Sequence, residues 1–81
     1  MRFARNPEVL WRSTSQGPVL LSSEMEQPAR IGGVAALVWE VLDEPLDANG
    51  VAQSVRELAG ESLDTDGALA ELEARGLVNR R

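Results

Sequence analysis

Apolar residues recur at helical spacing in three segments after Gly32, which predicts three short amphipathic helices. In the first, the apolar face falls at i, i+1, i+3, i+4, i+7 and i+8, and consists of Val34, Ala35, Leu37, Val38, Val41 and Leu42. Trp39 borders this face. We expect it to pack in the core over the preceding strands rather than stack on a ligand, because large aromatic side chains mostly bury area. Pro45 disfavours helical backbone at Glu44, so the helix ends there.

The second predicted helix has a start signal and a stop signal in the sequence. Asp47 is a favoured N-cap residue, and Gly60 stands where glycine commonly terminates a helix. The expected buried face consists of Ala48, Val51, Ala52, Val55, Leu58 and Ala59.

The third predicted helix carries two different faces. Asp64 or Thr65 caps it, and Leu69 and Leu72 face the core. A second stripe falls at i, i+3, i+4, i+7 and i+11 and consists of Asp64, Gly67, Ala68, Glu71 and Arg75. Its small middle and charged ends are suited to accept side chains of a partner. An ordinary solvated face is the alternative, and the stripe alone favours it.

The residues before these helices alternate in the manner of strands. A hairpin is predicted with strands at 9–14 and 19–22 around a Gly-Pro turn, and a polar connection at 23–26 follows it. In the first strand, Val9 and Trp11 share one face, and Leu10 and Arg12 share the other. Residues 1–7 are expected to form a flexible arm.

A short third strand is predicted at residues 27–31. Pro28 lacks a backbone donor, which places this strand at an edge of the sheet. The open backbone groups of an edge are available to a partner strand. Alternatively, Pro28 only protects the edge against aggregation, and this residue does not decide between the two. The whole pattern predicts a single α+β domain over residues 1–81, with a three-stranded antiparallel sheet followed by three helices.

Composition narrows the class of protein. The chain has 81 residues, enough for one domain, and 43% of them are hydrophobic, enough for one core. Cysteine is absent, which rules out a disulfide framework and a thiolate metal site. No apolar run approaches the ~20 residues of a membrane span, and no apolar stretch follows the N-terminal arginines as in a signal peptide. We therefore expect a cytoplasmic protein without a membrane partner.

The charge pattern disfavours nucleic acid as a partner. The net charge is −5, all eight basic residues are arginine, and four of these arginines lie at the chain ends. Proteins that bind nucleic acid normally present a basic patch that neutralises phosphates. The middle of this chain presents acidic groups instead.

The residue types also disfavour catalysis. The chain has no histidine, cysteine, tyrosine or lysine, so a serine would lack a neighbouring base. A site made only of carboxylates is chemically feasible, but so short a chain barely encloses a pocket. We expect a protein that is not an enzyme and needs no cofactor or metal.

The order of strands and helices, over about residues 8–78, resembles the PqqD-like family, the precursor-recognition elements of ribosomal peptide biosynthesis. The matching positions are Val19-Leu20-Leu21, Ile31-Gly32 with Ala35 and Val38, the run from Asp47 to Val55, and Asp64, Leu69, Leu72 and Gly76-Leu77-Val78. The chain departs from the family pattern at Gly32, where asparagine is frequent, and at Ala68, where a larger apolar residue is usual. Pro28 also interrupts the third strand.

The resemblance implies a winged-helix-like domain that does not bind DNA. It further implies that the leader of a precursor peptide adds as a strand beside the third strand, against the third helix. The implied peptide-binding residues are Gln27, Pro28, Ala29, Arg30 and Ile31 on the strand, and Asp64, Gly67, Ala68, Glu71 and Arg75 on the helix. The implied function is a non-catalytic adaptor that presents the leader to a separate modifying enzyme or protease, with Trp11, if exposed, on the surface that contacts the enzyme.

Two other classes of function share this predicted order of elements. A winged-helix DNA-binding regulator would need a basic recognition helix, but the segment from Asp64 to Arg75 holds four acidic residues and one arginine. A structural subunit would keep its edge strand permanently covered, either by another protein or by a second copy in a homodimer.

Overall fold

The computed structural model describes residues 1–21 and 27–80, so the connection predicted at 23–26 lies outside the described residues. The elements are β1 (Phe3–Arg5), β2 (Leu10–Thr14), β3 (Gly17–Leu21), β4 (Ala29–Arg30), α1 (Gly33–Val41), α2 (Ala48–Ala59), α3 (Thr65–Ala74) and β5 (Val78–Arg80). The α+β class and the sequence of three antiparallel strands followed by three helices are as predicted. The Gly-Pro turn was misplaced, because Gly17 and Pro18 pair with Thr14 and Ser13 as the first residues of β3. The strands β1 and β5 are additional.

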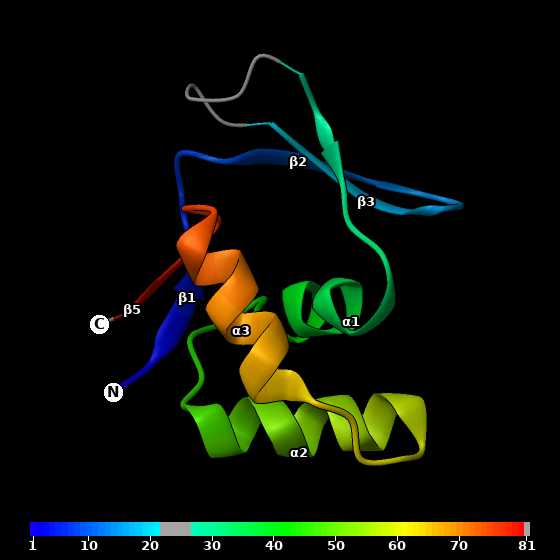
Figure 1. Cartoon of the computed structure of the whole chain (residues 1–81), viewed down its shortest axis with the longest axis vertical. Helices are drawn as coiled ribbons and strands as arrows, with labels where there is room; N and C mark the ends of the chain where they lie inside the picture. The colour runs from blue at the N-terminus through cyan, green and yellow to red at the C-terminus, as the bar shows by residue number, and fades with distance from the viewer. Residues whose placement is uncertain (22–26, 81) are drawn as a thin grey trace.

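Two separate sheets flank the helices (Figure 1). The three-stranded sheet has the order β2-β3-β4 and is antiparallel throughout, so β4 is an edge strand, as predicted from Pro28, which directly precedes it. The second sheet pairs β1 with β5 and brings the two ends of the chain together. In Figure 1 the three-stranded sheet lies at one end of the molecule and α2 at the other, with α1 and α3 between them.

The expectation of a flexible N-terminal arm was wrong. Phe3 and Ala4 are buried, and Phe3 exchanges two backbone hydrogen bonds with Leu46, of 2.7 and 3.0 Å. The segment is too short to show a period, and its partners, Leu46 and the C-terminal strand β5, lie far away in the sequence. Residues 77 and 78, expected only as a short apolar segment, are fully buried, and Val78 begins β5.

One core joins the sheet to all three helices. Its fully buried side chains include Leu20, Val38, Trp39, Val51, Val55, Leu72, Leu77 and Val78. The core role expected for Trp39 is therefore confirmed. The alternation predicted for β2 is seen only in part. Val9, just before the strand, is buried and Leu10 is 71% exposed, but all five residues of β2 are exposed, including Trp11 at 39%. In the described parts of the chain, no helix has the length and apolar content needed to cross a lipid bilayer.

The buried face of α2 is narrower than predicted. Val51 and Val55, one helical turn apart, are fully buried, whereas Ala52, Leu58 and Ala59 are exposed. The C-terminal turn of α2 thus extends past the core, and its apolar residues face solvent. Both predicted ends of the helix are confirmed. Asp47 Oδ1 accepts a 2.6 Å hydrogen bond from the Gly50 N–H, and Gly60 closes the helix with a φ of +79°.

Candidate peptide-binding site

The outer edge of β4 presents backbone groups to solvent. The Ile31 N–H donates a 3.0 Å hydrogen bond to the Pro18 carbonyl of β3, and Ala29 pairs with Leu20. Hydrogen bonding alternates along an antiparallel ladder, so Arg30, between these two positions, turns its N–H and C=O away from β3. These two backbone groups are therefore open to a partner strand. The Arg30 side chain is exposed and donates a hydrogen bond to Oε1 of Gln16.

The edge is shorter than the sequence predicted. Gln27 and Pro28 are exposed but precede the strand, and Ile31 is buried in the core with 2% exposure. Ile31 therefore offers a partner neither its side chain nor its N–H. Two residues limit this edge. By the same alternation position 28 points outward, but Pro28 has no N–H to offer, and Gly32 is already the N-cap residue of α1. Of the five residues predicted to bind a partner strand, Arg30 is thus the one whose backbone N–H and C=O both point outward from β4.

The expectation that Ala68 faces solvent was wrong. Ala68 is 7% exposed and belongs to the core, together with Leu69 and Leu72 as predicted. The cause is that α3 packs on α1, α2 and β5, so a wide arc of the helix is covered. With the buried Thr65, these residues fall at i, i+3, i+4 and i+7. This regular stripe was the signal that the sequence analysis missed.

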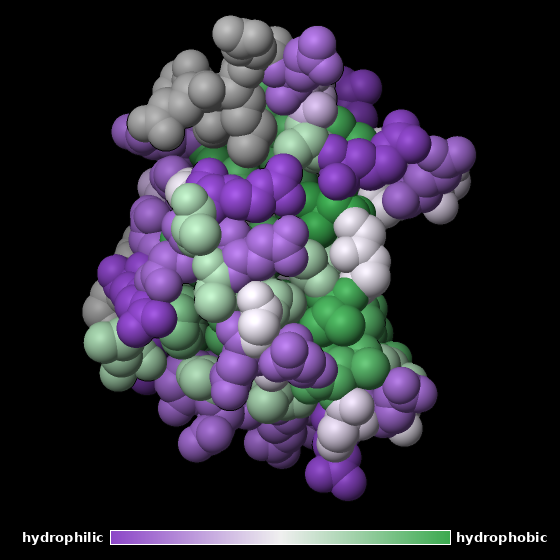
Figure 2. Space-filling model, viewed as in Figure 1, coloured by the Kyte–Doolittle hydropathy of each residue, from purple (hydrophilic) through white to green (hydrophobic). Residues whose placement is uncertain are grey.

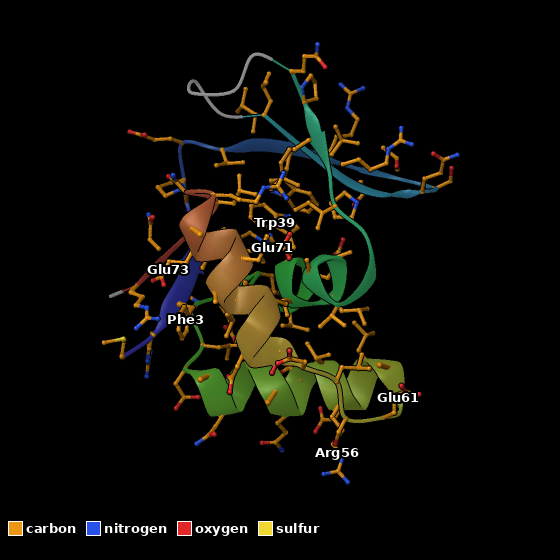
Figure 3. All side chains as sticks on the ribbon, viewed as in Figure 1. Phe3, Trp39, Arg56, Glu61, Glu71 and Glu73 are labelled. Atoms are coloured by element: carbon orange, nitrogen blue, oxygen red, sulfur yellow. The ribbon has the colours of Figure 1, made fainter. Side chains whose placement is uncertain are left out.

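The other predicted residues of α3 remain at its surface. Asp64 caps the helix, since its Oδ1 accepts a 3.0 Å hydrogen bond from the Gly67 N–H. This oxygen is therefore already hydrogen-bonded to the backbone of α3. Glu71 and Arg75 form an exposed ion pair of 3.9 Å. In the view of Figure 3, Glu71 lies on the side of α3 toward β4, and Glu73 lies on the opposite side. Of these two glutamates, Glu71 is thus the one on the side of α3 that faces a ligand at β4.

Apolar surface accompanies this edge. Figure 2 shows it over the region of α1, where the molecular outline is hollowed between the sheet and α2. Val34, Ala35, Ala36 and Leu37 of α1 are only half-buried and pack at the margin of the core. The chain enters α1 directly after β4, so this apolar surface begins where the edge strand ends.

A cluster of one arginine and two tryptophans was not predicted. The guanidinium of Arg5 lies 4.5 Å from the ring centroid of Trp11 and 5.1 Å from that of Trp39, and the two rings meet edge to face at 5.9 Å. Burial lowers the pKa of Arg5, against the opposing effects of Glu40 and Asp43. Trp39 Nε1 is buried without an acceptor among the described residues. Trp11, proposed as an enzyme contact, is 39% exposed and partly committed to this cluster.

A second concave surface lies between α1 and α2. It has a volume of about 650 Å³ and is lined by Glu40, Val41, Asp43, Glu44, Leu46, Ser54, Glu57 and Leu58. No sequence pattern pointed to it, because its residues come from the end of one helix, a connection and the far half of another.

No family model, curated protein or solved structure matches this chain. The resemblance to PqqD-like proteins therefore rests on the sequence pattern alone. What the structure adds is the geometry of the edge, the apolar surface of α1 and the position of Glu71.

Proposed function

We propose that this protein is a non-catalytic adaptor that binds the leader of a ribosomally made precursor peptide and presents it to a separate modifying enzyme or protease. The observation that carries the proposal is the outward N–H and C=O of Arg30 on the edge strand β4. An extended peptide laid antiparallel or parallel to this edge would pair with both groups, as in other cases of strand addition.

The backbone contacts alone would bind weakly. Each hydrogen bond contributes only about 0.5–1.5 kcal/mol net, and Arg30 offers two. The remaining affinity would come from apolar leader side chains on the half-buried residues of α1, such as Val34 and Leu37. Burial of apolar area contributes roughly 25 cal/mol per Å², so a few aliphatic anchors would dominate the binding free energy.

Charged residues would contribute more to the specificity for a leader than to the affinity. Glu71 would pair with a basic leader residue, and Arg75 with an acidic one, after their mutual ion pair opens. Exposed pairs of this kind contribute about 0–1 kcal/mol each. The protein itself performs no chemistry and needs no cofactor in this proposal. It acts in the cytoplasm, where ribosomal precursor peptides are made.

The test is a titration with labelled leader segments, taken from short open reading frames beside the gene and followed by fluorescence anisotropy. We expect saturable binding to one leader with a Kd below about 10 μM. Arg30→Pro removes the outward N–H without removing a hydrogen bond to β3, and should abolish this binding. Failure of every neighbouring leader to bind the folded protein would reject the proposal.

The opposite edge of the sheet supplies a matched control. Ser13 of β2 pairs with Pro18, whose carbonyl faces β4, so the Ser13 N–H also points outward. Ser13→Pro should leave leader binding unchanged. Equal loss in both variants would mean that proline disturbs the sheet and that β4 has no special role. Light scattering across a range of concentrations distinguishes a homodimer that covers the β4 edge, since Arg30→Pro would then dissociate it.

A further inference from the structure

The groove between α1 and α2 combines an apolar floor with an acidic rim. Val41, Leu46 and Leu58 supply its apolar surface, and Leu58 is 58% exposed in spite of its size. When a partner covers an exposed leucine at the mouth of a groove, the burial of its apolar surface makes the binding free energy more favourable. The groove has a volume of about 650 Å³ and is widely open to solvent, a shape suited to the surface of another protein rather than to an enclosed small molecule.

Four of the eight lining residues are carboxylates: Glu40, Asp43, Glu44 and Glu57. They come from the last turn of α1, the connection after it and the last turn of α2. The described part of the chain holds no group of three or more acidic side chains arranged for a metal ion. Arg56, the basic residue of α2, points away from the body of the molecule in Figure 3. Arg5 interacts with Glu40 and Asp43, and Arg2 lies beside Glu44, so part of the rim charge is offset. The four carboxylates still outnumber these two arginines, which leaves a net negative charge for a basic partner.

The walls of the groove also indicate the form of the partner. Five of the eight lining residues lie in α1 and α2, and none lies in one of the strands, so the groove offers side chains rather than a strand edge. Such a surface accepts an amphipathic helix that inserts apolar anchors at i, i+3 or i+4, and i+7. The floor is preformed, because the backbone of Leu46 is fixed by its two hydrogen bonds with Phe3.

We propose that this groove docks an amphipathic helix of a protein partner, with leucine-like anchors against Leu58 and Leu46 and arginine or lysine residues against Glu57, Glu40 and Asp43. The surface is separate from the β4 edge, since the two share no residue, and its occupation does not depend on the leader proposal. If both hold, the adaptor has one surface for the peptide and another for the protein that receives it.

The probe for this proposal is a labelled synthetic helix of about 14 residues, long enough for four turns. Leucines occupy one face at i, i+3 and i+7, and arginines flank that face. A second peptide keeps the arginines and replaces each leucine by serine. We expect saturable binding of the first peptide, weakened by salt, and binding of the second that is weaker by about tenfold or more.

Three substitutions at exposed positions assign the site. Leu58→Ser should weaken binding of the leucine peptide by about fivefold and Glu57→Arg by about tenfold. Glu61→Arg makes the same charge change just after the end of α2, outside the groove (Figure 3), and should change the Kd by less than about twofold. Circular dichroism and thermal melting check that each variant folds, and an amide NMR titration maps the contact to residues 40–46 and 54–58.

Several outcomes would overturn the proposal. They are the absence of saturable binding, equal affinity for the two peptides, equal effects of Glu57→Arg and Glu61→Arg, or NMR shifts confined to β2 or β4. Equal affinity for the two peptides would leave only a diffuse electrostatic attraction to polycations. A leader titration with Leu58→Ser runs in parallel. If Leu58→Ser binds the leader as the parent protein does, the groove and the β4 edge are separate sites, and each proposal can be rejected without the other.

Discussion

Arg5 donates two hydrogen bonds, of 2.9 and 2.6 Å, to the backbone carbonyl oxygen of Trp39 in the last turn of α1. Carbonyls of a final helical turn lack the usual partner within the helix, and that of Trp39 also accepts a longer hydrogen bond of 3.3 Å from the Leu42 N–H. A cation at this end also favours the helix dipole. The same guanidinium covers the ring of Trp11. One side chain from the N-terminal strand thus joins the sheet to the end of the central helix.

Replacing Arg5 by alanine should lower the free energy of unfolding by about 1.5–3 kcal/mol, the usual range for hydrogen bonds to a charged group. Urea denaturation followed by tryptophan fluorescence measures this loss, and the emission of Trp11 should shift as its ring becomes more exposed. Arg12→Ala removes the same charge from an exposed position on β2 and should change stability by less than about 0.5 kcal/mol. Similar losses in both variants would show that net charge, not the cluster, is responsible.

Phe3 tests whether the N-terminal strand is part of the folded domain. Its side chain is buried and its backbone pairs with both β5 and Leu46. Phe3→Ala should cost about 3–5 kcal/mol, as large core truncations do. The exposed neighbour Arg2 provides the control, and Arg2→Ala should leave the melting temperature nearly unchanged. If Phe3→Ala were equally mild, the segment would be the flexible arm that the sequence suggested.

The sequence was sufficient wherever a local signal determined the structure. Asp47 and Gly60 marked the ends of α2 because caps depend on nearby backbone groups. Strand alternation placed Val9 and Leu10 on opposite faces, and the proline at position 28 placed β4 at an edge. Each of these predictions needed only a few neighbouring residues.

Elements that depend on distant partners could not be predicted in the same way. β1 exists because β5 and the connection before α2 lie beside it, and three residues carry too little pattern to reveal that. The assignment of Ala68 failed for a related reason. A small residue fits an exposed stripe or a close helix contact equally well, and the packing of α3 on two other helices decided between them.

Ala68→Arg should therefore unfold or severely destabilise the protein, rather than block a peptide groove. Its site is covered, so the new side chain would overpack the core and bury an unpaired charge, at a cost of at least about 3 kcal/mol. Ala70 lies two residues further along α3 and is exposed. Ala70→Arg should remain within about 0.5 kcal/mol of the parent protein. Chemical denaturation measures the free energy of unfolding of both variants. An Ala68→Arg protein as stable as Ala70→Arg would show that Ala68 is exposed to solvent.

Gly17 joins the hairpin turn to the strand that supports the peptide edge. It has a φ of +107°, and a Cβ atom there would lie 2.8 Å from the carbonyl oxygen of Ile31, just beyond β4. Gly17→Ala should therefore combine backbone strain with displacement of Ile31, and cost about 2–3 kcal/mol. Gly60 also has positive φ, but the space around it is open, so Gly60→Ala should cost only about 1 kcal/mol. Because the Gly17 clash moves β4 itself, Gly17→Ala should also weaken leader binding at temperatures where the protein remains folded, whereas Gly60→Ala should not. Equal stability losses and equal affinities in the two variants would show that Gly17 matters only for its φ, and that the position of β4 does not depend on this close approach.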